Sequence, residues 1–258
     1  MRLDSITPLI ITRDEEPNIA RSLERLAWAA RIVVVDSFSE DRTMEILRGD
    51  PRIMVVQRAF TSFADQCNAG LAHVKTPWVL SLDADYICSA DLAAELEAVP
   101  DETEASGFAA RFRYCSHGRP LRGTLYPPRV VLHRRNGASY VSVGHAHRLQ
   151  IDGAIGSLTS TIDHDDRKPF RTWLAAQRTY AANEAEKLRT GRAEEFDLAD
   201  RLRRRAFVLP VVTPLYCLFY KGLILDGPAG WFYTAQRAYA ETLVSLLLMR
   251  NAFRRGTS

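Results

Sequence analysis

The sequence predicts an α/β fold with a doubly wound, Rossmann-like mixed sheet and a helical C-terminal extension. Up to about residue 135, short apolar runs alternate with segments of helical periodicity, which is typical of such sheets. From Pro169 onward the periodicity is helical. We therefore expect an α/β domain over residues 1–168 and a helical region over residues 169–258.

The first half of the chain supplies the expected sheet elements in order. The apolar run Ile6–Thr12 predicts a strand, and Ile19, Leu23 and Leu26 then recur at helical spacing. The β-branched run that ends at Asp36 is typical of a strand buried on both faces. The next expected elements are a helix over 41–48, a strand over 53–57, a helix over 63–74 and a strand over 77–83.

The second half changes character after Ala105. We expect strands over 107–114 and 129–133, separated by a loop rich in Gly, Pro and Arg. Helices are expected from Phe170 toward Leu188, over about 197–225, and after the turn at Asp226-Gly227-Pro228. We expect this last helix to end near Met249.

Composition excludes several classes of protein. The chain of 258 residues is 47% hydrophobic and 25% charged, which excludes disordered and fibrous proteins, and its net charge of +3 is too small to indicate nucleic acid. The four cysteines lack CxxC spacing, which favours reduced thiols in the cytoplasm. The apolar stretch Ala206–Tyr220 contains two prolines and is shorter than the roughly 20 residues that span a bilayer.

The basic residues are mostly arginines, since Arg accounts for 30 of the 34. Several lie together at Arg201, Arg203, Arg204 and Arg205, close to aromatic C-terminal segments. Basic patches beside apolar faces are typical of proteins on anionic membranes, which predicts a peripheral position on the cytoplasmic face of the inner membrane. The alternatives are a solvated helix face for the arginines, and packing between helices or a homodimer for the aromatic residues.

Asp83 and Asp85 directly follow the apolar strand over 77–83. Two carboxylates held together at a strand end repel each other unless a cation compensates them. Mg²⁺ and Mn²⁺ prefer oxygen ligands, and Mg²⁺ is commonly bound by one or two carboxylates and substrate phosphates. The pair therefore predicts a site for a divalent metal and a diphosphate. A pair of solvated loop aspartates is the alternative.

Two further polar residues, Thr12 and Asp36, lie at the ends of expected strands. Ligands of doubly wound sheets bind beyond the carboxyl ends of the strands. Asp36 could accept a hydrogen bond from a ribose or nucleobase, or it could cap the next helix. The acidic residues Glu15 and Glu16 also suit the start of a helix.

Several motifs resemble those of family 2 glycosyltransferases. They are the opening segment from Ile10 to Ile19, Val33-Val-Val-Asp-Ser with Asp41-Arg-Thr, the helix with Gln66, Asn68 and Gly70, and Leu80-Ser-Leu-Asp-Ala-Asp. The branch that adds glucose or a similar sugar to the lipopolysaccharide inner core is the most similar, through Tyr126-Pro127, Asp152-Gly153, His164 and the Leu-Asp-Gly turn near Asp226.

This resemblance implies a GT-A fold, a nucleotide-sugar donor and a divalent metal, Mg²⁺ or Mn²⁺. It further implies an inverting transfer of a hexose, with UDP as the expected nucleotide, to a glycolipid or cell-envelope saccharide. Asp83, Asp85 and His164 are the implied metal ligands. The implied donor-binding residues are Thr12, Arg13, Glu15, Asp36, Ser37, Gln66, Asn68, Asp83 and Ala84.

Two departures from the family pattern concern catalysis. Tyr86 follows Asp85 where the family usually carries a further carboxylate, and His147 occupies the position of an expected Glu. An inverting transfer needs a base within reach of the acceptor hydroxyl, and imidazole can act as one near neutral pH. His147 is our candidate, with His145 as its competitor; a structural role is the alternative for both.

Two other functions remain open at this point. The two departures would also suit a homologue that has lost catalysis and acts as a binding or scaffold protein. A nucleotidyltransferase could use a similar sheet and metal, but it would be expected to carry a Gly-rich loop after the first strand, and Thr12-Arg-Asp-Glu contains no glycine.

Overall fold

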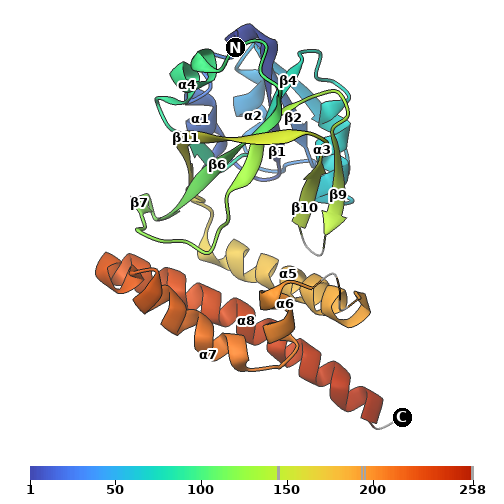
Figure 1. Ribbon diagram of the computed structural model, residues 1–258, viewed down its shortest axis with the longest axis vertical. Helices are drawn as coiled ribbons and strands as arrows, with labels where there is room; N and C mark the ends of the chain where they lie inside the picture. The colour runs from blue at the N-terminus through green and yellow to red at the C-terminus, as the bar shows by residue number, and fades with distance from the viewer. Residues whose placement is uncertain (144–145, 193, 195, 257–258) are drawn as a thin grey trace. The chain divides into compact units, whose positions relative to one another are not determined.

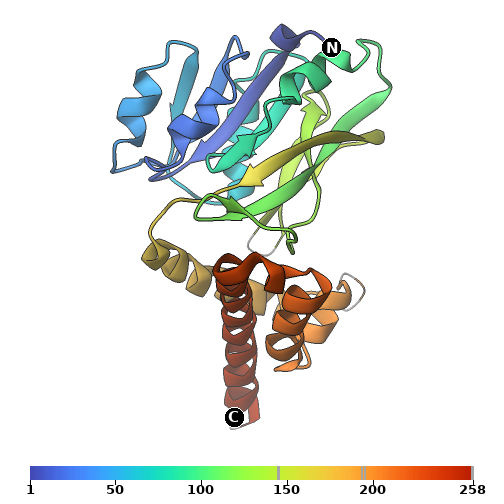
Figure 2. The ribbon, with the colours of Figure 1, turned by 90° about the vertical axis from the view of Figure 1, so that its left-hand side faces the viewer.

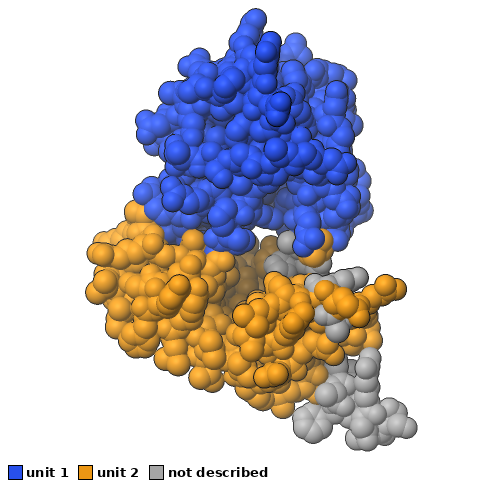
Figure 3. Space-filling view, viewed as in Figure 1, with its two compact units in different colours: residues 1–118, 126–142, 146–167 blue, residues 119–125, 143–145, 168–258 orange. Residues whose placement is uncertain are grey.

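The computed structural model describes residues 1–143, 146–192, 194 and 196–256. They form two compact units, coloured separately in Figure 3. Unit 1 consists of residues 1–118, 126–142 and 146–167, and unit 2 consists mainly of residues 119–125 and the chain from Lys168 onward.

Unit 1 contains the sheet and the first four α-helices (Figure 1). Its helices are η1 (Leu3–Ser5), α1 (Ile19–Glu24), α2 (Thr43–Arg48), α3 (Phe63–Leu71) and α4 (Leu92–Ala98). Its strands are β1 (Ile6–Thr12), β2 (Ile32–Asp36), β3 (Ile53–Gln57), β4 (Trp78–Asp83), β5 (Tyr86–Cys88), β6 (Ala105–Ser116), β8 (Arg129–Arg134), β9 (Ser139–Val143), β10 (Ala146–Gln150) and β11 (Ala154–His164).

The main sheet has the strand order β3-β2-β1-β4-β8-β6-β11-β5. Strands β3, β2, β1 and β4 are parallel, β8 is antiparallel to both β4 and β6, and β11 is parallel to β6. Strands β9 and β10 pair separately. This mixed sheet, with helices in the C-terminal part of the chain, confirms the predicted fold class.

Strands β1 and β2 are buried on both faces, as the apolar run in β2 predicts, whereas the edge strand β3 is partly exposed. Ile10 and Val34 belong to a core cluster that includes residues of α1, α2 and α4, whereas Leu9 and Val35 pack with Ala64 and Leu71 of α3. Alternate side chains of one strand therefore enter different cores, and the polar residues at the strand ends are held on a rigid support.

Unit 2 is helical (Figure 2). It contains β7 (Arg119–Pro120), α5 (Phe170–Thr190), α6 (Leu198–Arg203), α7 (Val208–Leu215), the π-helix η3 (Tyr216–Tyr220), the 3₁₀-helix η4 (Leu223–Asp226) and α8 (Gly227–Gly256). The last helix extends beyond the expected end near Met249.

The helical region expected over residues 197–225 is in fact broken into short pieces. Ala206, Phe207 and Gly222 have positive φ angles of 21°, 62° and 71°, which no α-helix accommodates. Pro214 lies inside α7, near its end and the start of the π-helix.

In the described residues, no single helix is long and apolar enough to cross a membrane. The pair Val208–Tyr220 and Leu223–Arg250, bent by 73°, meets that test only when the two helices are taken together.

Candidate functional site

The carboxyl ends of the parallel strands meet at one edge of the sheet. Thr12 is the register partner of Asp36, Asp36 is the partner of Gln57, and Asp83 is the partner of Ile11, the residue before Thr12. The structure therefore brings the predicted residues Thr12, Asp36 and Asp83 together on neighbouring strands.

Thr12 and Asp36 differ in the hydrogen bonds that their side chains make. The hydroxyl of Thr12 is buried and has no hydrogen-bond partner within the part of the chain that the structure describes. Asp36 is fully buried; its carboxylate accepts hydrogen bonds from the backbone and hydroxyl of Ser39 and, at 3.1 Å, from the amide of Gln57. Because buried polar groups normally have partners, the Thr12 hydroxyl is suited to a ligand group.

Asp36 does not cap the following helix, which was the alternative explanation for it. Helix α2 begins at Thr43, whose backbone N–H donates to Asp41 at 2.9 Å. Burial alone would raise the pKa of Asp41, but hydrogen bonds from Thr43 and Glu16 outweigh it and hold this pKa below its ordinary value. Asp41 therefore satisfies the first N–H of α2, and Asp36, the last residue of β2, makes no hydrogen bond to this helix start among the described residues.

The loops after β1 and β2 are bonded to each other and strained. The backbone N–H of Asp14 donates to Ser39 Oγ at 2.9 Å, and that of Glu40 donates to Asp14 Oδ1 at 2.8 Å. Asp14 and Phe38 have φ angles of 51° and 58°, a conformation that is uncommon outside glycine and clusters at functional sites. Of the two other predicted residues here, Arg13 is exposed and Glu15 is buried, where it accepts a hydrogen bond from Asn18 at 2.7 Å.

Of the two predicted residues in helix α3, Gln66 contacts the loop after β2, whereas Asn68 contacts β9. Gln66 donates from Nε2 to Ser37 Oγ at 2.8 Å, while its buried Oε1 has no partner among the described residues. Asn68 bonds the backbone of Tyr140 with both ends of its amide, each at 2.9 Å. Asn68 therefore holds β9 in place, with one N–H and one oxygen lone pair of its amide left over.

Asp83, Ala84 and Asp85 form the turn between β4 and β5. Ala84 is buried, and its carbonyl accepts a hydrogen bond from Ser22 at 2.6 Å. His164, at the end of β11, is the register partner of Tyr86 and lies with Nε2 2.9 Å from Asp85 Oδ2. The antiparallel pairing of β5 and β11 thus brings together two predicted metal ligands that are far apart in the sequence.

The side chains at this turn are of types that can bind a divalent cation. In the structure Asp85 and His164 are bonded to each other at 2.9 Å, and the carboxylate and imidazole are both groups that can bind a divalent metal. The described residues contain no cluster of three or more potential ligands, so phosphate and water would complete the coordination. Burial alone would lower the pKa of His164, but the charge of Asp85, its hydrogen bond to His164 and the charge of Asp83 outweigh burial and raise this pKa.

His147 is half-buried in β10 near the rings of Tyr140 and Phe63, at 5.6 and 6.2 Å between centroids. Burial lowers the pKa of His147, so the imidazole is neutral at pH 7 and able to accept a proton. The competing candidate, His145, lies outside the described residues.

The sequence interpretation missed a chain of polar contacts beside Asp83. Tyr86 is buried and its hydroxyl contacts that of Tyr126, which accepts a hydrogen bond from Arg129 at 2.7 Å. Arg129 also donates to the His147 carbonyl at 3.3 Å. Burial opposes the charge of Arg129, but Tyr126, Tyr86 and Asp83 outweigh it, and the pKa of Arg129 is raised. Tyr86, the departure from the family pattern, therefore supports a cation near the site.

The chain is similar to a curated protein over nearly its whole length. A curated relative, the lipopolysaccharide core biosynthesis glycosyltransferase LpsC of Rhizobium meliloti (strain 1021), is 24% identical over 260 residues, which cover 96% of this chain and 94% of the relative.

Two solved structures are also similar. The structure of S. aureus TarS 1–349 in complex with UDP-GlcNAc has 13% identity and a TM-score of 0.48, covering 97% of this chain and 91% of that one. Glucosyl-3-phosphoglycerate synthase from Mycobacterium tuberculosis, in complex with Mn²⁺, UDP and glucosyl-3-phosphoglycerate, has 12% identity and a TM-score of 0.46, covering 69% of this chain and 79% of that one.

A family model decides the assignment. Residues 8–147, more than half of the chain, match the model described as Glycosyl transferase family 2. This segment includes the strand ends with Thr12, Asp36 and Asp83, as well as Asp85 and His147. The chain is therefore a glycosyltransferase and belongs to glycosyl transferase family 2.

Proposed function

We propose that this enzyme transfers a hexose, glucose-like in shape, from a UDP-sugar to a glycolipid or cell-envelope saccharide, with inversion and with a divalent metal. The observation that carries the proposal is the row of strand ends that holds Thr12, Asp36 and Asp83 beside the Asp85–His164 pair. The name of the lipopolysaccharide core relative supports the class of acceptor. A lipid-linked acceptor favours a position on the cytoplasmic face of the inner membrane.

The donor half of the site would hold the nucleoside between the first two strand ends. Asp36 would accept hydrogen bonds from a ribose or base, and the Thr12 hydroxyl and Gln66 Oε1, which have no partners among the described residues, would bond the same nucleoside. Buried groups without partners gain the most from a ligand that completes their hydrogen bonds. Arg13, Glu15 and Ser37 shape this part of the site.

Asp85 and His164 would hold Mg²⁺ or Mn²⁺, with Asp83 next to the ribose and diphosphate. When bound, the ion would neutralise the charge that grows on the departing diphosphate. Arg129 would add a second positive charge from within the protein.

Transfer follows from positioning and proton removal. The acceptor oxygen bonds to the anomeric carbon, the bond from that carbon to the diphosphate oxygen breaks on the opposite face, and the hydroxyl proton passes to the imidazole of His147. The neutral state of His147 at pH 7 suits this role. Replacing His147 by Ala is expected to lower kcat by about 10²–10⁴-fold while donor binding persists.

A thermal-shift panel of UDP-, GDP- and dTDP-sugars, with and without Mn²⁺, tests the donor and the metal. We expect UDP-sugars to raise Tm most, with a further rise in Mn²⁺. Asp85→Ala should abolish the further rise in Tm that Mn²⁺ causes. Asp91→Ala, a change at an exposed aspartate beyond β5, should preserve this rise. An unchanged metal effect in Asp85→Ala would show that the metal binds elsewhere.

A non-catalytic binding protein is the competing function. Slow hydrolysis of UDP-sugar without an acceptor, dependent on Mn²⁺ and lost in Asp85→Ala, would exclude it. If no nucleotide-sugar shifts Tm under any condition, the proposed donor class is wrong.

A further inference from the structure

Segment α7–η3 of unit 2 has its apolar side facing solvent. Leu209, Thr213 and Cys217, four residues apart, are 8%, 7% and 0% exposed and form the inner face. The outer face carries six large apolar or aromatic side chains, which we call the apolar stripe: Val211, Val212, Leu215, Tyr216, Phe219 and Tyr220. Phe219 and Tyr220 are 65% and 76% exposed.

The stripe is large for a surface that meets only water. It continues in η4 with Leu225, which is 68% exposed, and in Ile224. Contiguous apolar patches of this kind mark interaction sites on proteins. Phe207, at the entrance to α7, is also exposed and has a φ angle of 62°, so a strained backbone holds an aromatic ring outward.

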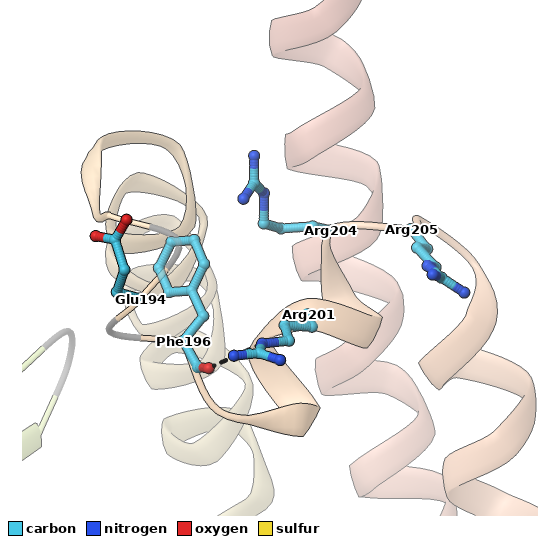
Figure 4. A pocket seen from close by; sticks show the side chains of 5 residues that line it. All are labelled: Glu194, Phe196, Arg201, Arg204 and Arg205. Atoms are coloured by element: carbon cyan, nitrogen blue, oxygen red, sulfur yellow. Dashed lines mark hydrogen bonds between the residues drawn. The ribbon is translucent and has the colours of Figure 1, made fainter.

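Basic residues flank the stripe at both ends. Arg204 and Arg205 precede α7, a few residues before the stripe begins, and with Arg201, Phe196 and Glu194 they line a hollow of about 580 Å³ (Figure 4). Lys221 follows it, with Nζ 5.7 Å from the ring centroid of Tyr216. Between Arg201 and Leu225 the sequence contains no Asp or Glu.

The arginines of this segment have two different roles. Arg203 points into the unit, where it pairs with Glu184 and Glu241 at 3.3 and 2.8 Å. Arg204 and Arg205 are exposed and have no ion pair among the described residues, and Arg204 lies 5.3 Å from the ring centroid of Phe196. Guanidinium groups of this kind suit phosphate, to which they can donate paired hydrogen bonds.

Charge argues against a second copy of the chain as the occupant. A two-fold dimer through this face would bring the same patch of both copies together. Arg201, Arg204 and Arg205 of both copies would then meet, with Glu194 the one carboxylate among the described residues that line their hollow. An anionic lipid surface offers both an apolar layer for the stripe and phosphates for the arginines.

We propose that α7, η3 and η4 form a docking surface for an anionic lipid bilayer, with the apolar stripe in the membrane interface and Arg201, Arg204 and Arg205 on lipid phosphates. The stripe is then the part of the enzyme that enters the interface, while the opposite face of α7 stays packed on α8. This deepens the membrane position proposed above. Its test needs no nucleotide-sugar or acceptor, so it can fail independently of the proposed activity.

Flotation of the full chain with lipid vesicles tests the surface. We expect binding to phosphatidylcholine vesicles that contain phosphatidylglycerol, weak binding to phosphatidylcholine alone, and loss of binding as salt rises. Phe219→Ser/Tyr220→Ser and Arg204→Glu/Arg205→Glu should each lower partitioning by about tenfold or more. Matched controls on unit 1, Met54→Ser/Ile155→Ser and Arg31→Glu/Arg48→Glu, should bind like the unchanged protein.

Several results would overturn the proposal. They are absence of binding to anionic vesicles, equal losses in the control variants, or unchanged binding in both docking variants. Light scattering can give a further result against the proposal. If the protein is a dimer, and Phe219→Ser/Tyr220→Ser makes it a monomer while vesicle binding persists, the apolar stripe binds a second copy of the chain. The Tm of each variant, measured by circular dichroism, shows whether a loss of binding comes from the changed surface or from unfolding.

Discussion

Arg129 is a half-buried cation that donates hydrogen bonds to the hydroxyl of Tyr126 and to the carbonyl of His147. It forms no salt bridge among the described residues, although the charge of Asp83 nearby helps to raise its pKa. Buried charges are usually paired, and the cost of an unpaired one is high. A diphosphate at the neighbouring Asp83 turn would add further negative charge beside Arg129.

Replacing Arg129 by Met is therefore expected to weaken UDP binding by about tenfold to a hundredfold, because a hydrogen bond to a charged group contributes about 1.5–3 kcal/mol. Calorimetric titration of UDP in the presence of Mn²⁺ measures this. Arg113→Met, which removes a half-exposed guanidinium paired with Asp163, is the matched control and should bind normally. Equal affinity in both variants would argue against Arg129 as a donor contact.

His133 is a buried titratable residue away from the proposed chemistry. Its Nδ1 lies 2.9 Å from the Arg134 carbonyl and must donate, so its Nε2, 2.8 Å from Tyr140 Oη, accepts. Burial lowers the pKa of His133. As pH falls below about 6.5, the unfolded chain gains this proton before the folded one, and stability must fall.

Urea unfolding between pH 8 and pH 5 checks this effect. The unchanged protein should lose more free energy of unfolding below pH 6.5 than His133→Gln, which lacks the titrating group. His73→Gln, at an exposed histidine, should follow the unchanged protein. Identical pH profiles for all three proteins would mean that His133 does not contribute.

Among the elements, α3 shows how closely a helix can approach the sheet. A Cβ on Gly70 would lie 2.2 Å from Leu9 Cδ1 and 2.8 Å from Val35 Cγ2. Gly70→Ala would gain about 1 kcal/mol in helix propensity, but overpacking of a core costs about 1–3 kcal/mol. We expect a net loss of stability, seen as a lower Tm.

Gly49→Ala, at the C-terminus of α2, is the control for Gly70→Ala. The nearest atom to its added Cβ would be the Ile46 carbonyl oxygen at 3.3 Å, so only a small neighbouring shift is needed. Its Tm should change less than that of Gly70→Ala. The reverse order would contradict the close packing of α3.

The elements that the sequence predicts best are those with local signals. Strands β1 and β3 have the predicted bounds, because each is a short apolar run between polar residues. The 197–225 region could not be predicted as four pieces, since its breaks depend on positive φ angles at Ala206 and Phe207, residues that usually avoid them.

The site residues also divide into those with a local sequence signal and those without one. Thr12, Asp36 and Asp83 could be placed on one edge because parallel strands align their carboxyl ends. The contact between Tyr86 and Tyr126 joins residues 40 positions apart and leaves no local pattern. Arg129 is one of 30 arginines, so its burial could be recognised only in the structure.

At the scale of the whole molecule, unit 2 has its own ionic core. Arg203 pairs with Glu184, Asp200 and Glu241, and Lys187 pairs with Asp200 at 2.9 Å. These carboxylates raise the pKa of Arg203 despite its burial. Such a network stabilises unit 2 only while it is complete, because each buried carboxylate depends on its partner.

Arg203→Met should therefore lower the free energy of unfolding by about 3–5 kcal/mol, the typical cost of breaking a buried ion pair. Denaturant unfolding, followed by circular dichroism, measures it. Arg201→Met, at an exposed arginine two positions away, should change stability far less. Similar losses in both variants would show that the network contributes little.

The loop 119–125 has a consequence for how the chain is made. The backbone of Arg122 donates to Asp226, 104 residues later, and that of Leu125 donates to Tyr233, 108 residues later. Leu121 of the same loop is buried. On the ribosome, this loop emerges long before those partners exist, and contacts of such long sequence separation form slowly. Assembly of unit 2 must therefore wait until the start of α8 has been synthesised, however early the strands of unit 1 have paired.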